Sequence, residues 1–164
     1  MIQPLAYIHP QAKIAETVVI EPFVTIYKDV VIGEGTWIGS NVTIMDGARI
    51  GKNCRIFPGA VVSAPPQDMK YKGEASTVTI GDNTIIRECV TLNRGTALDK
   101  NTTTIGSNCL LMAYVHIAHD CVIGNNVIIA NSVQLAGHIE VQDYAFIGGA
   151  SAVHQFVSIG AHSI

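Results

Sequence analysis

The stretch VIGEGTWIGSNVTIMDGARIGKNCRIFPGAVV, residues 31–62, repeats a pattern every six residues. The aliphatic residues that mark the period are Ile32, Ile38, Ile44, Ile50, Ile56 and Val62. Four positions after each of these anchors the chain carries a small or β-branched residue, such as Val42 or Cys54. Two inward positions in every six fit neither the period of an α-helix nor the alternation of a long strand. The stretch therefore predicts very short strands joined by tight corners.

The same six-residue period extends through most of the chain. Its anchors reach back to Ile8, return between Ile80 and Leu92, and run without a break from Ile105 to Ile159. Residues that tolerate left-handed backbone angles recur three positions after an anchor, at Gly35, Asn41, Gly47, Asn53, Gly59, Asn83, Asn108 and Asn126. The chain should bend at these positions, so that three hexads close a triangular coil. Between seven and eight stacked coils then form an all-β, parallel solenoid.

The composition fits one domain over residues 1–164. Hydrophobic residues make up 48% of the chain and charged residues 14%, which argues against disorder. A formal net charge of −3 argues against a nucleic-acid-binding protein, which normally has a basic face. No apolar run approaches the roughly 20 residues that cross a bilayer, and the first residues lack a secretory signal. We therefore expect a cytoplasmic protein without membrane insertion.

The four cysteines are Cys54, Cys89, Cys109 and Cys121, and no two of them form a CxxC pair. Three of them occupy the position where the repeat places a small buried side chain, which suits a reduced thiol. We expect structural thiols rather than disulfides or metal ligands.

Two polar segments interrupt the period, at 68–79 and about 98–104, and we expect both to project from the solenoid as loops. Every third hexad lies on the same side of a triangular solenoid. The hexads that begin at Val62 and Leu92 precede the two loops, and the later hexads of that side carry three histidines. The sequence therefore predicts that the loops and the histidines share one face.

Residues that are 18 apart become vertical neighbours on this face. His119, Gly137 and Gln155 should form one column. We expect His138 and His154 one residue to either side of that column on neighbouring coils. His116 should lie at the preceding corner. Such a cluster predicts a functional site, whereas single outward histidines elsewhere are typical of any solenoid surface.

Histidines on a prism face suggest either a zinc site or proton transfer. The zinc-binding β-helix carbonic anhydrases include a ligand pair spaced HxxxxH, and no such pair occurs here. We therefore expect no metal and no cofactor. General-base catalysis by His119 is the preferred hypothesis, because an unperturbed imidazole titrates near neutral pH.

Asp120 follows His119 directly and has two interpretations. Its carboxylate can fix the tautomer of the imidazole, or it can satisfy backbone N–H groups at a corner. Gly137 leaves its amide unobstructed, so this N–H is a candidate oxyanion donor. Serine-nucleophile, P-loop and dinucleotide motifs are absent. A base and an oxyanion donor without a nucleophile indicate direct acyl transfer to an acceptor hydroxyl or amine.

Three segments resemble the UDP-N-acetylglucosamine O-acyltransferases that begin lipid A synthesis. They are HIAHDCVIGNN (116–126), LAGHIEVQDYAFIGGASAVHQFVSIGAH (135–162) and PQDMKYKGE (66–74). The hexad motifs alone are common to many proteins, but AVHQF (152–156) together with the PQDxK loop is specific. The resemblance covers nearly the whole chain and implies a left-handed parallel β-helix. The usual rule for parallel crossovers favours the opposite hand, so handedness rests on the resemblance alone.

The resemblance also implies roles for individual residues. His119 would deprotonate the 3-hydroxyl of UDP-N-acetylglucosamine as it attacks the thioester of a 3-hydroxyacyl chain held on acyl carrier protein. Asp120 would support His119, and the Gly137 amide would receive the oxyanion. The residues that would contact the substrates are Gln67, Asp68, Lys70, His116, His138, His154 and Gln155.

Members of the resembled family are homotrimers with active sites between adjacent prisms. Their carrier protein is acidic, so four cations on or near the loops are candidates to attract it, namely Lys70, Lys72, Arg94 and Lys100. The family continues beyond the equivalent of Ile164 with further coils and a helical region, and we expect that C-terminal helical region to be absent from this chain. The alternative functions are the related N-acyltransferase, which acts on a free amine, and an inactive trimeric scaffold.

Overall fold

Short strands and tight corners alternate along the whole chain in the computed structural model, which describes residues 1–164. Left-handed corners form where the repeat places Gly or Asn, and also at residues of other types, such as Phe23, Tyr114 and Asp120. All eight predicted bend positions have positive φ angles, between 53° at Asn53 and 87° at Gly47. The left-handed backbone at these positions turns the chain after each strand, which is why most strands contain only two residues.

The strands form three parallel sheets, one for each side of a prism. The first sheet contains β1 (Tyr7–Ile8), β4 (Thr25–Ile26), β7 (Thr43–Ile44), β10 (Val61–Ala64), β13 (Thr91–Asn93), β16 (His116–Ile117), β19 (Gln134–Leu135) and β22 (Ala152–Val153). The second contains β2 (Lys13–Ile14), β5 (Val31–Ile32), β8 (Ala48–Ile50), β11 (Thr77–Ile80), β14 (Thr102–Ile105), β17 (Val122–Ile123), β20 (Glu140–Val141) and β23 (Ser158–Ile159). The third contains β3 (Val19–Ile20), β6 (Trp37–Ile38), β9 (Arg55–Ile56), β12 (Ile85–Ile86), β15 (Leu110–Leu111), β18 (Ile128–Ile129) and β21 (Phe146–Ile147).

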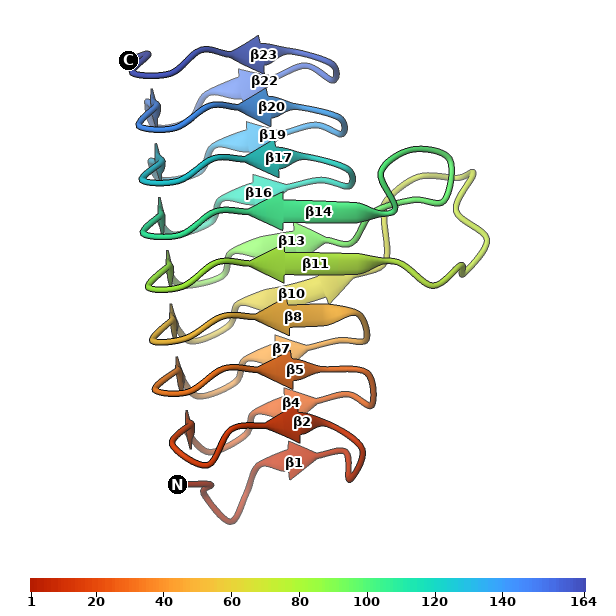
Figure 1. The fold of residues 1–164 in the computed structure, drawn as a ribbon, viewed down its shortest axis with the longest axis vertical. Helices are drawn as coiled ribbons and strands as arrows, with labels where there is room; N and C mark the ends of the chain where they lie inside the picture. The colour runs from red at the N-terminus through yellow and green to blue at the C-terminus, as the bar shows by residue number, and fades with distance from the viewer.

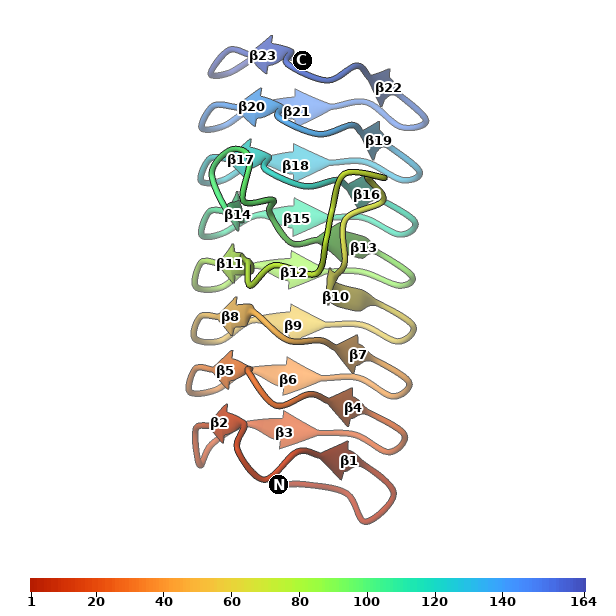
Figure 2. The ribbon, with the colours of Figure 1, turned by 90° about the vertical axis from the view of Figure 1, so that its right-hand side faces the viewer.

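The coils wind with a left hand. In Figure 1 the chain climbs from its N-terminus at the bottom to its C-terminus at the top, and the strands nearest the viewer run from right to left. The view turned by 90° shows the same direction across its front (Figure 2). The fold is therefore a left-handed parallel β-helix, as the resemblance implied.

The anchors of the repeat stack inside the prism and form its core. A single cluster of 35 buried residues runs along the axis, and Ile38, Ile86 and Ile117 within it are fully buried. Each such side chain contributes roughly 1.5–3 kcal/mol relative to leaving it in water. Because the core is continuous from coil to coil, the register of one strand fixes that of the next. No helical segment of the chain is suited to span a membrane.

The cysteines confirm the prediction of free thiols. None is in a disulfide, and Cys54, Cys109 and Cys121 are buried in the core. Burial raises the pKa of the Cys121 thiol to about 11. Since the thiolate is the reactive form, these groups are inert packing residues.

Both predicted loops project from the solenoid, but their predicted bounds were wrong. The first loop, 65–76, lies between β10 and β11, and the second loop, 94–101, lies between β13 and β14. The predicted ends fell too late because Thr77–Ile80 and Thr102–Ile105 are strands that pair along their whole length. β-branched threonines favour such extended pairs, which sequence periodicity alone did not reveal. Figure 2 shows both loops at the corner between the first and second sheets.

Candidate active site

His119 lies at the corner from which both loops emerge. β16 ends at Ile117, and Asp120 turns the chain toward β17 with a φ of 59°. The Asp120 N–H donates to the Thr103 hydroxyl at 2.8 Å, which closes the corner from inside. The His119 side chain is 13% exposed, so it is both held by the corner and open to a ligand.

Asp120 makes contacts of both kinds that the sequence left as alternatives, one with an imidazole and one with a backbone N–H. Its fully buried carboxylate accepts hydrogen bonds from the Thr96 N–H at 3.0 and 3.1 Å and from the Thr96 hydroxyl at 2.7 Å. It also lies 2.9 Å from Nδ1 of His119. Because an ionised carboxylate only accepts, Nδ1 of His119 is the donor and Nε2 remains available as an acceptor. Asp120 therefore joins the second loop to the imidazole.

Thr96 was not predicted from the sequence, and it offers a direct test of this connection. We expect Thr96→Val, which keeps the shape but removes the hydroxyl, to lower the free energy of unfolding by about 1–3 kcal/mol because a buried carboxylate loses a donor. Thermal or urea unfolding measures the change. The exposed Thr17 is a control, because its hydroxyl only accepts a hydrogen bond from Gly35 N–H at the surface. Equal stability of Thr96→Val and Thr17→Val would contradict the importance of the Asp120 contacts.

Gly137 lies directly above His119, as the column predicted. A Cβ atom at Gly137 would lie 2.7 Å from Cε1 and 2.8 Å from Nε2 of His119, closer than real contacts allow. The absence of a side chain therefore makes the space that the imidazole occupies. The Gly137 N–H donates no hydrogen bond within the protein, so this buried residue presents an unpaired donor beside His119.

His138 is held by three aromatic and acidic neighbours. Its Nδ1 lies 2.6 Å from Oδ2 of Asp99, on the second loop. Its ring stacks on Phe156 at 4.6 Å between centroids, and its edge meets His119 at 5.0 Å and 88° between planes. The hydrogen bond from His138, with lesser help from Lys100, lowers the pKa of the Asp99 carboxyl below its usual value. His119 and His138 thus each have a carboxylate partner; the second loop supplies Asp99 and holds Asp120 through Thr96.

One cleft collects six of the predicted site residues. It has a volume of about 600 Å³ and is lined by Gln67, Asp68, Met69, Lys70, His119, His138, Gln155 and Phe156. The first four come from the first loop, and the others come from the corners of three successive coils. Met69 and Phe156 were not predicted as lining residues, and no chemical motif marks them. The prediction that loops and histidines share a face is confirmed.

His116 and His154 lie along the first sheet in a separate shallow groove of about 410 Å³. The prediction that His116 lies at a corner was wrong, because it is a strand residue of β16 whose side chain points outward. Its Nδ1 lies 2.7 Å from the Thr91 hydroxyl, and burial lowers the pKa of the imidazole below its usual value. His154 is exposed, with Nδ1 at 3.2 Å from the Gln155 carbonyl oxygen.

The four cations near the loops divide into two pairs. Arg94 donates from Nε to the Tyr71 hydroxyl at 3.0 Å and from a terminal nitrogen to the Asp46 carbonyl at 2.9 Å, so it fastens the first loop. Lys100 lies 3.4 Å from Asp99 and 3.8 Å from Glu140. Lys70 and Lys72 form no ion pair and remain available to a partner.

His119, Asp120 and His138 are close enough together to raise the question of a metal, since their ligand atoms lie within 4.8 Å of one another. In this arrangement Nδ1 of each imidazole is already hydrogen-bonded to a carboxylate, and both Asp120 oxygens accept from Thr96. A tetrahedral zinc site needs ligand atoms that converge on one point. The observed pairing instead orients two imidazoles, and it suits proton transfer by Nε2 of His119.

Comparison with known proteins gives a consistent result. A family model described as "Bacterial transferase hexapeptide (six repeats)" matches residues 29–64 and 102–137. An acyl-[acyl-carrier-protein]–UDP-N-acetylglucosamine O-acyltransferase from Janthinobacterium sp. (strain Marseille) is 51% identical over 164 residues, which are 100% of this chain and 63% of that protein. The enzyme of the same name from Aliivibrio fischeri (strain MJ11) is 60% identical over 99% of this chain and 64% of its own length.

Solved structures agree with these relatives. The UDP-N-acetylglucosamine acyltransferase of Francisella novicida superposes with a TM-score of 0.97 at 50% identity, over 99% of this chain and 59% of that one. A structure of LpxA from Acinetobacter baumannii has a TM-score of 0.95 at 46% identity, over 96% of this chain and 61% of that one. The chain thus spans less than two thirds of the length of these relatives.

Proposed function

The chain belongs to the hexapeptide-repeat acyltransferases, in the family of UDP-N-acetylglucosamine O-acyltransferases, and we propose that it has the family's activity. The reaction moves a 3-hydroxyacyl chain from acyl carrier protein to the 3-hydroxyl of UDP-N-acetylglucosamine, the first step of lipid A synthesis. The observation that carries the proposal is the His119–Asp120 pair, fixed by the second loop beneath a glycine whose N–H is free.

The proposed mechanism follows from the two groups at this pair that have no hydrogen-bond partner within the protein, Nε2 of His119 and the N–H of Gly137. Nε2 of His119 takes the proton of the sugar 3-hydroxyl as its oxygen attacks the thioester carbonyl. Asp120 stabilises the imidazolium that forms. The Gly137 N–H donates to the oxyanion, a contribution of about 3 kcal/mol in well-studied acyl transfers. The intermediate then collapses, and the thiolate of the carrier protein leaves with the proton returned by His119.

Two regions of the surface would hold the substrates. The cleft between the first loop and the corners contains His138 and Gln155 together with Gln67, Asp68 and Lys70, and we assign it to the sugar nucleotide and the reacting end of the acyl donor. The groove along the first sheet is lined mainly by Leu135, Ala136, Ala152 and Val153 between His116 and His154. Its apolar surface suits an alkyl chain, with the two histidines contacting substrate at its edge.

The free lysines support acyl carrier protein as the donor. Lys70 lines the cleft and Lys72 follows on the same loop, and neither is neutralised by an internal carboxylate. An acidic carrier would be drawn to this loop by such charges. The unpaired thiols also favour a reducing compartment, so we place the protein in the cytoplasm.

A homotrimer is part of the proposal, because the cleft is shallow and needs a second wall. The third sheet turns mostly apolar side chains outward, namely Trp37, Ile85, Leu110, Ile128 and Phe146, and Arg55 interrupts this row. Such a stripe along the prism suits the surface of a second copy.

We expect Ile128→Glu to dissociate the trimer, because it would bury a charge between prisms. Light scattering after gel filtration should give three times the chain mass of 17.5 kDa for the wild type and a single chain mass for the variant. Val31→Glu, on the exposed face of the second sheet, is the matched control. A wild-type monomer, or a trimer that tolerates Ile128→Glu, would contradict this assembly.

The test of the reaction uses the full-length protein with 3-hydroxyacyl carrier protein and no added metal. Two acceptors are offered in parallel, UDP-N-acetylglucosamine and its 3-O-acylated derivative with a free amine. We expect transfer to the hydroxyl acceptor. Transfer to the amine alone would instead assign the chain to the N-acyltransferases. Absence of transfer to both, with calorimetry showing no binding of UDP-N-acetylglucosamine, would indicate a scaffold.

A further inference from the structure

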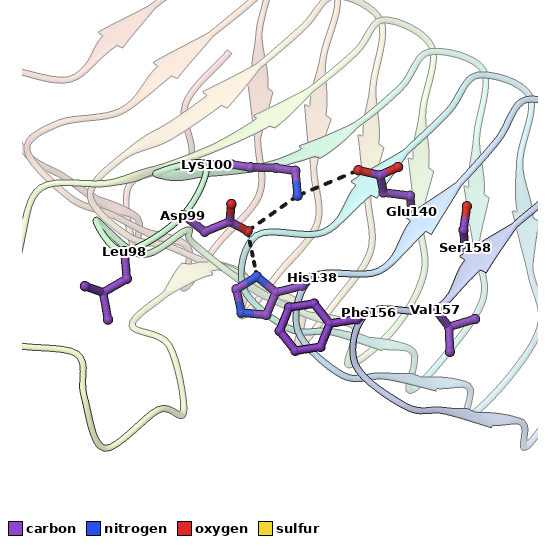
Figure 3. Close-up of a pocket in the computed structure, with 8 residues that line it drawn as sticks. All are labelled: Leu98, Asp99, Lys100, His138, Glu140, Phe156, Val157 and Ser158. Carbon is purple, nitrogen blue, oxygen red and sulfur yellow. Dashed lines mark hydrogen bonds and ion pairs between the residues drawn. The ribbon is translucent and has the colours of Figure 1, made fainter.

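The second loop reaches across the corner and ends against His138. Figure 3 shows Asp99 and Lys100 of this loop together with His138 and Glu140 of the coil at residues 135–141. Oδ2 of Asp99 lies 2.6 Å from Nδ1 of His138, and the same oxygen lies 3.4 Å from Nζ of Lys100. Lys100 in turn approaches Glu140 at 3.8 Å. A chain of alternating charges thus leads from the imidazole to the second sheet.

The position of His138 explains why it needs a partner. It occupies the left-handed corner position of its coil, with a φ of 64°, where Asp120 and Phe156 stand in the coils below and above. Phe156 covers one face of the ring by stacking, and His119 meets its edge. These contacts set the plane of the ring but leave open which of the two nitrogens carries the proton. Asp99 decides this point, because its carboxylate accepts only from an Nδ1–H.

We propose that Asp99 is a positioning residue for His138, which holds the imidazole as the Nδ1–H tautomer and so presents Nε2 to the substrate as a hydrogen-bond acceptor. The inference rests on the proposed function, because the substrate groups that donate to Nε2 are the hydroxyls and the acetamido N–H of the sugar. Asp99 and Asp120 then act in parallel, one on each histidine. The second loop supplies Asp99 directly and holds Asp120 through Thr96, so its contacts with the prism orient both imidazoles.

The alternative is that Asp99 serves only to fasten the loop. Glu140 separates the two roles, since it anchors Lys100 of the same loop and has no contact with His138. Asp99→Ala removes the loop contact and the imidazole contact together. Asp99→Asn keeps an oxygen acceptor for the Nδ1–H while it removes the charge. Glu140→Gln weakens the loop network alone and is the matched control.

The first experiment reads the tautomer without substrate. Long-range proton–nitrogen correlation spectra of protein with ¹⁵N-labelled histidine distinguish Nδ1–H from Nε2–H forms, and His138→Gln assigns the signals. We expect an Nδ1–H form in the wild type, in Asp99→Asn and in Glu140→Gln, and a shift to the Nε2–H form in Asp99→Ala. An unchanged His138 tautomer in Asp99→Ala would overturn the proposal.

The second experiment measures transfer to UDP-N-acetylglucosamine by the full-length protein. We expect Asp99→Ala to raise KM for the sugar nucleotide about tenfold with a smaller change in kcat, the order of one lost charged hydrogen bond. Asp99→Asn should restore most of the affinity, and Glu140→Gln should stay within about twofold. Equal losses in Asp99→Ala and Glu140→Gln would show a loop anchor and overturn the proposal. An inactive wild type would refute the proposed function, whereas the tautomer would still decide the role of Asp99.

Discussion

His119→Ala should abolish nearly all acyl transfer, with a fall in kcat of about a thousandfold. A positioned general base contributes about 10²–10⁴ to the rate, and no other imidazole is placed to replace this one. Nδ1 of His138 is held by Asp99, and its ring lies at 88° to that of His119, so we assign His138 to binding the substrate rather than to proton transfer. The measurement is steady-state transfer from acyl carrier protein to UDP-N-acetylglucosamine, with substrate binding followed separately by calorimetry.

The control is His162→Ala. His162 lies at a corner between the second and third sheets, where it stacks on Tyr144 at 5.0 Å, far from both loops. We expect this variant to keep wild-type kcat. We also expect His119→Ala to retain most of its affinity for UDP-N-acetylglucosamine, because the proposed role of His119 is in the transition state. Turnover by His119→Ala within tenfold of the wild type would refute the assignment of the base.

The period of six residues was sufficient to predict a parallel solenoid of triangular coils, but not its left hand, which rested on the family resemblance. Most hexads repeat the same local pattern of an aliphatic anchor and a small inward residue, and eight of them add Gly or Asn at the bend. Asn41 and Asn126 follow this pattern from opposite halves of the chain, and both turn with φ angles near those of the other corners, at 60° and 57°. Where Gly or Asn stands at the corner, local backbone chemistry and core burial agree, which is the condition under which a sequence pattern determines a structure.

The column of His119, Gly137 and Gln155 could also be predicted, because residues that are 18 apart in a regular triangular solenoid are vertical neighbours. The contacts between that column and the loops could not. Thr96 and Asp99 lie in a segment without periodicity, and nothing in their spacing places them against Asp120 and His138. Loop conformation depends on side-chain contacts with the finished prism rather than on a repeated local rule. The prediction that His116 lies at a corner failed for a simpler reason. When strands contain only two residues, an error of one position exchanges a strand residue for a corner residue.

Gly137→Ala should reduce kcat about a hundredfold while the protein stays folded. The added methyl would lie 2.7–2.8 Å from Cε1 and Nε2 of His119, so the imidazole must move by several tenths of an ångström. Displacements of this order at a reacting group cost about 10² in rate, because general-base catalysis depends on alignment. Gly137 does not have a positive φ, so the substitution brings no backbone strain that would unfold the corner.

Gly148→Ala is the matched control for this substitution. It lies at the corner between β21 and β22, on another edge of the prism, it also lacks a positive φ, and no atom within 4 Å would meet its Cβ. Thermal unfolding should show similar stability for the two variants, and only Gly137→Ala should lose transfer. The double variant Gly137→Ala with His119→Ala then separates the two roles of Gly137. If the glycine acts only by making room for the imidazole, the double variant should be no slower than His119→Ala alone. A further loss in the double variant would be the signature of the displaced N–H donor, and full activity of Gly137→Ala would refute the placement of the reaction at this column.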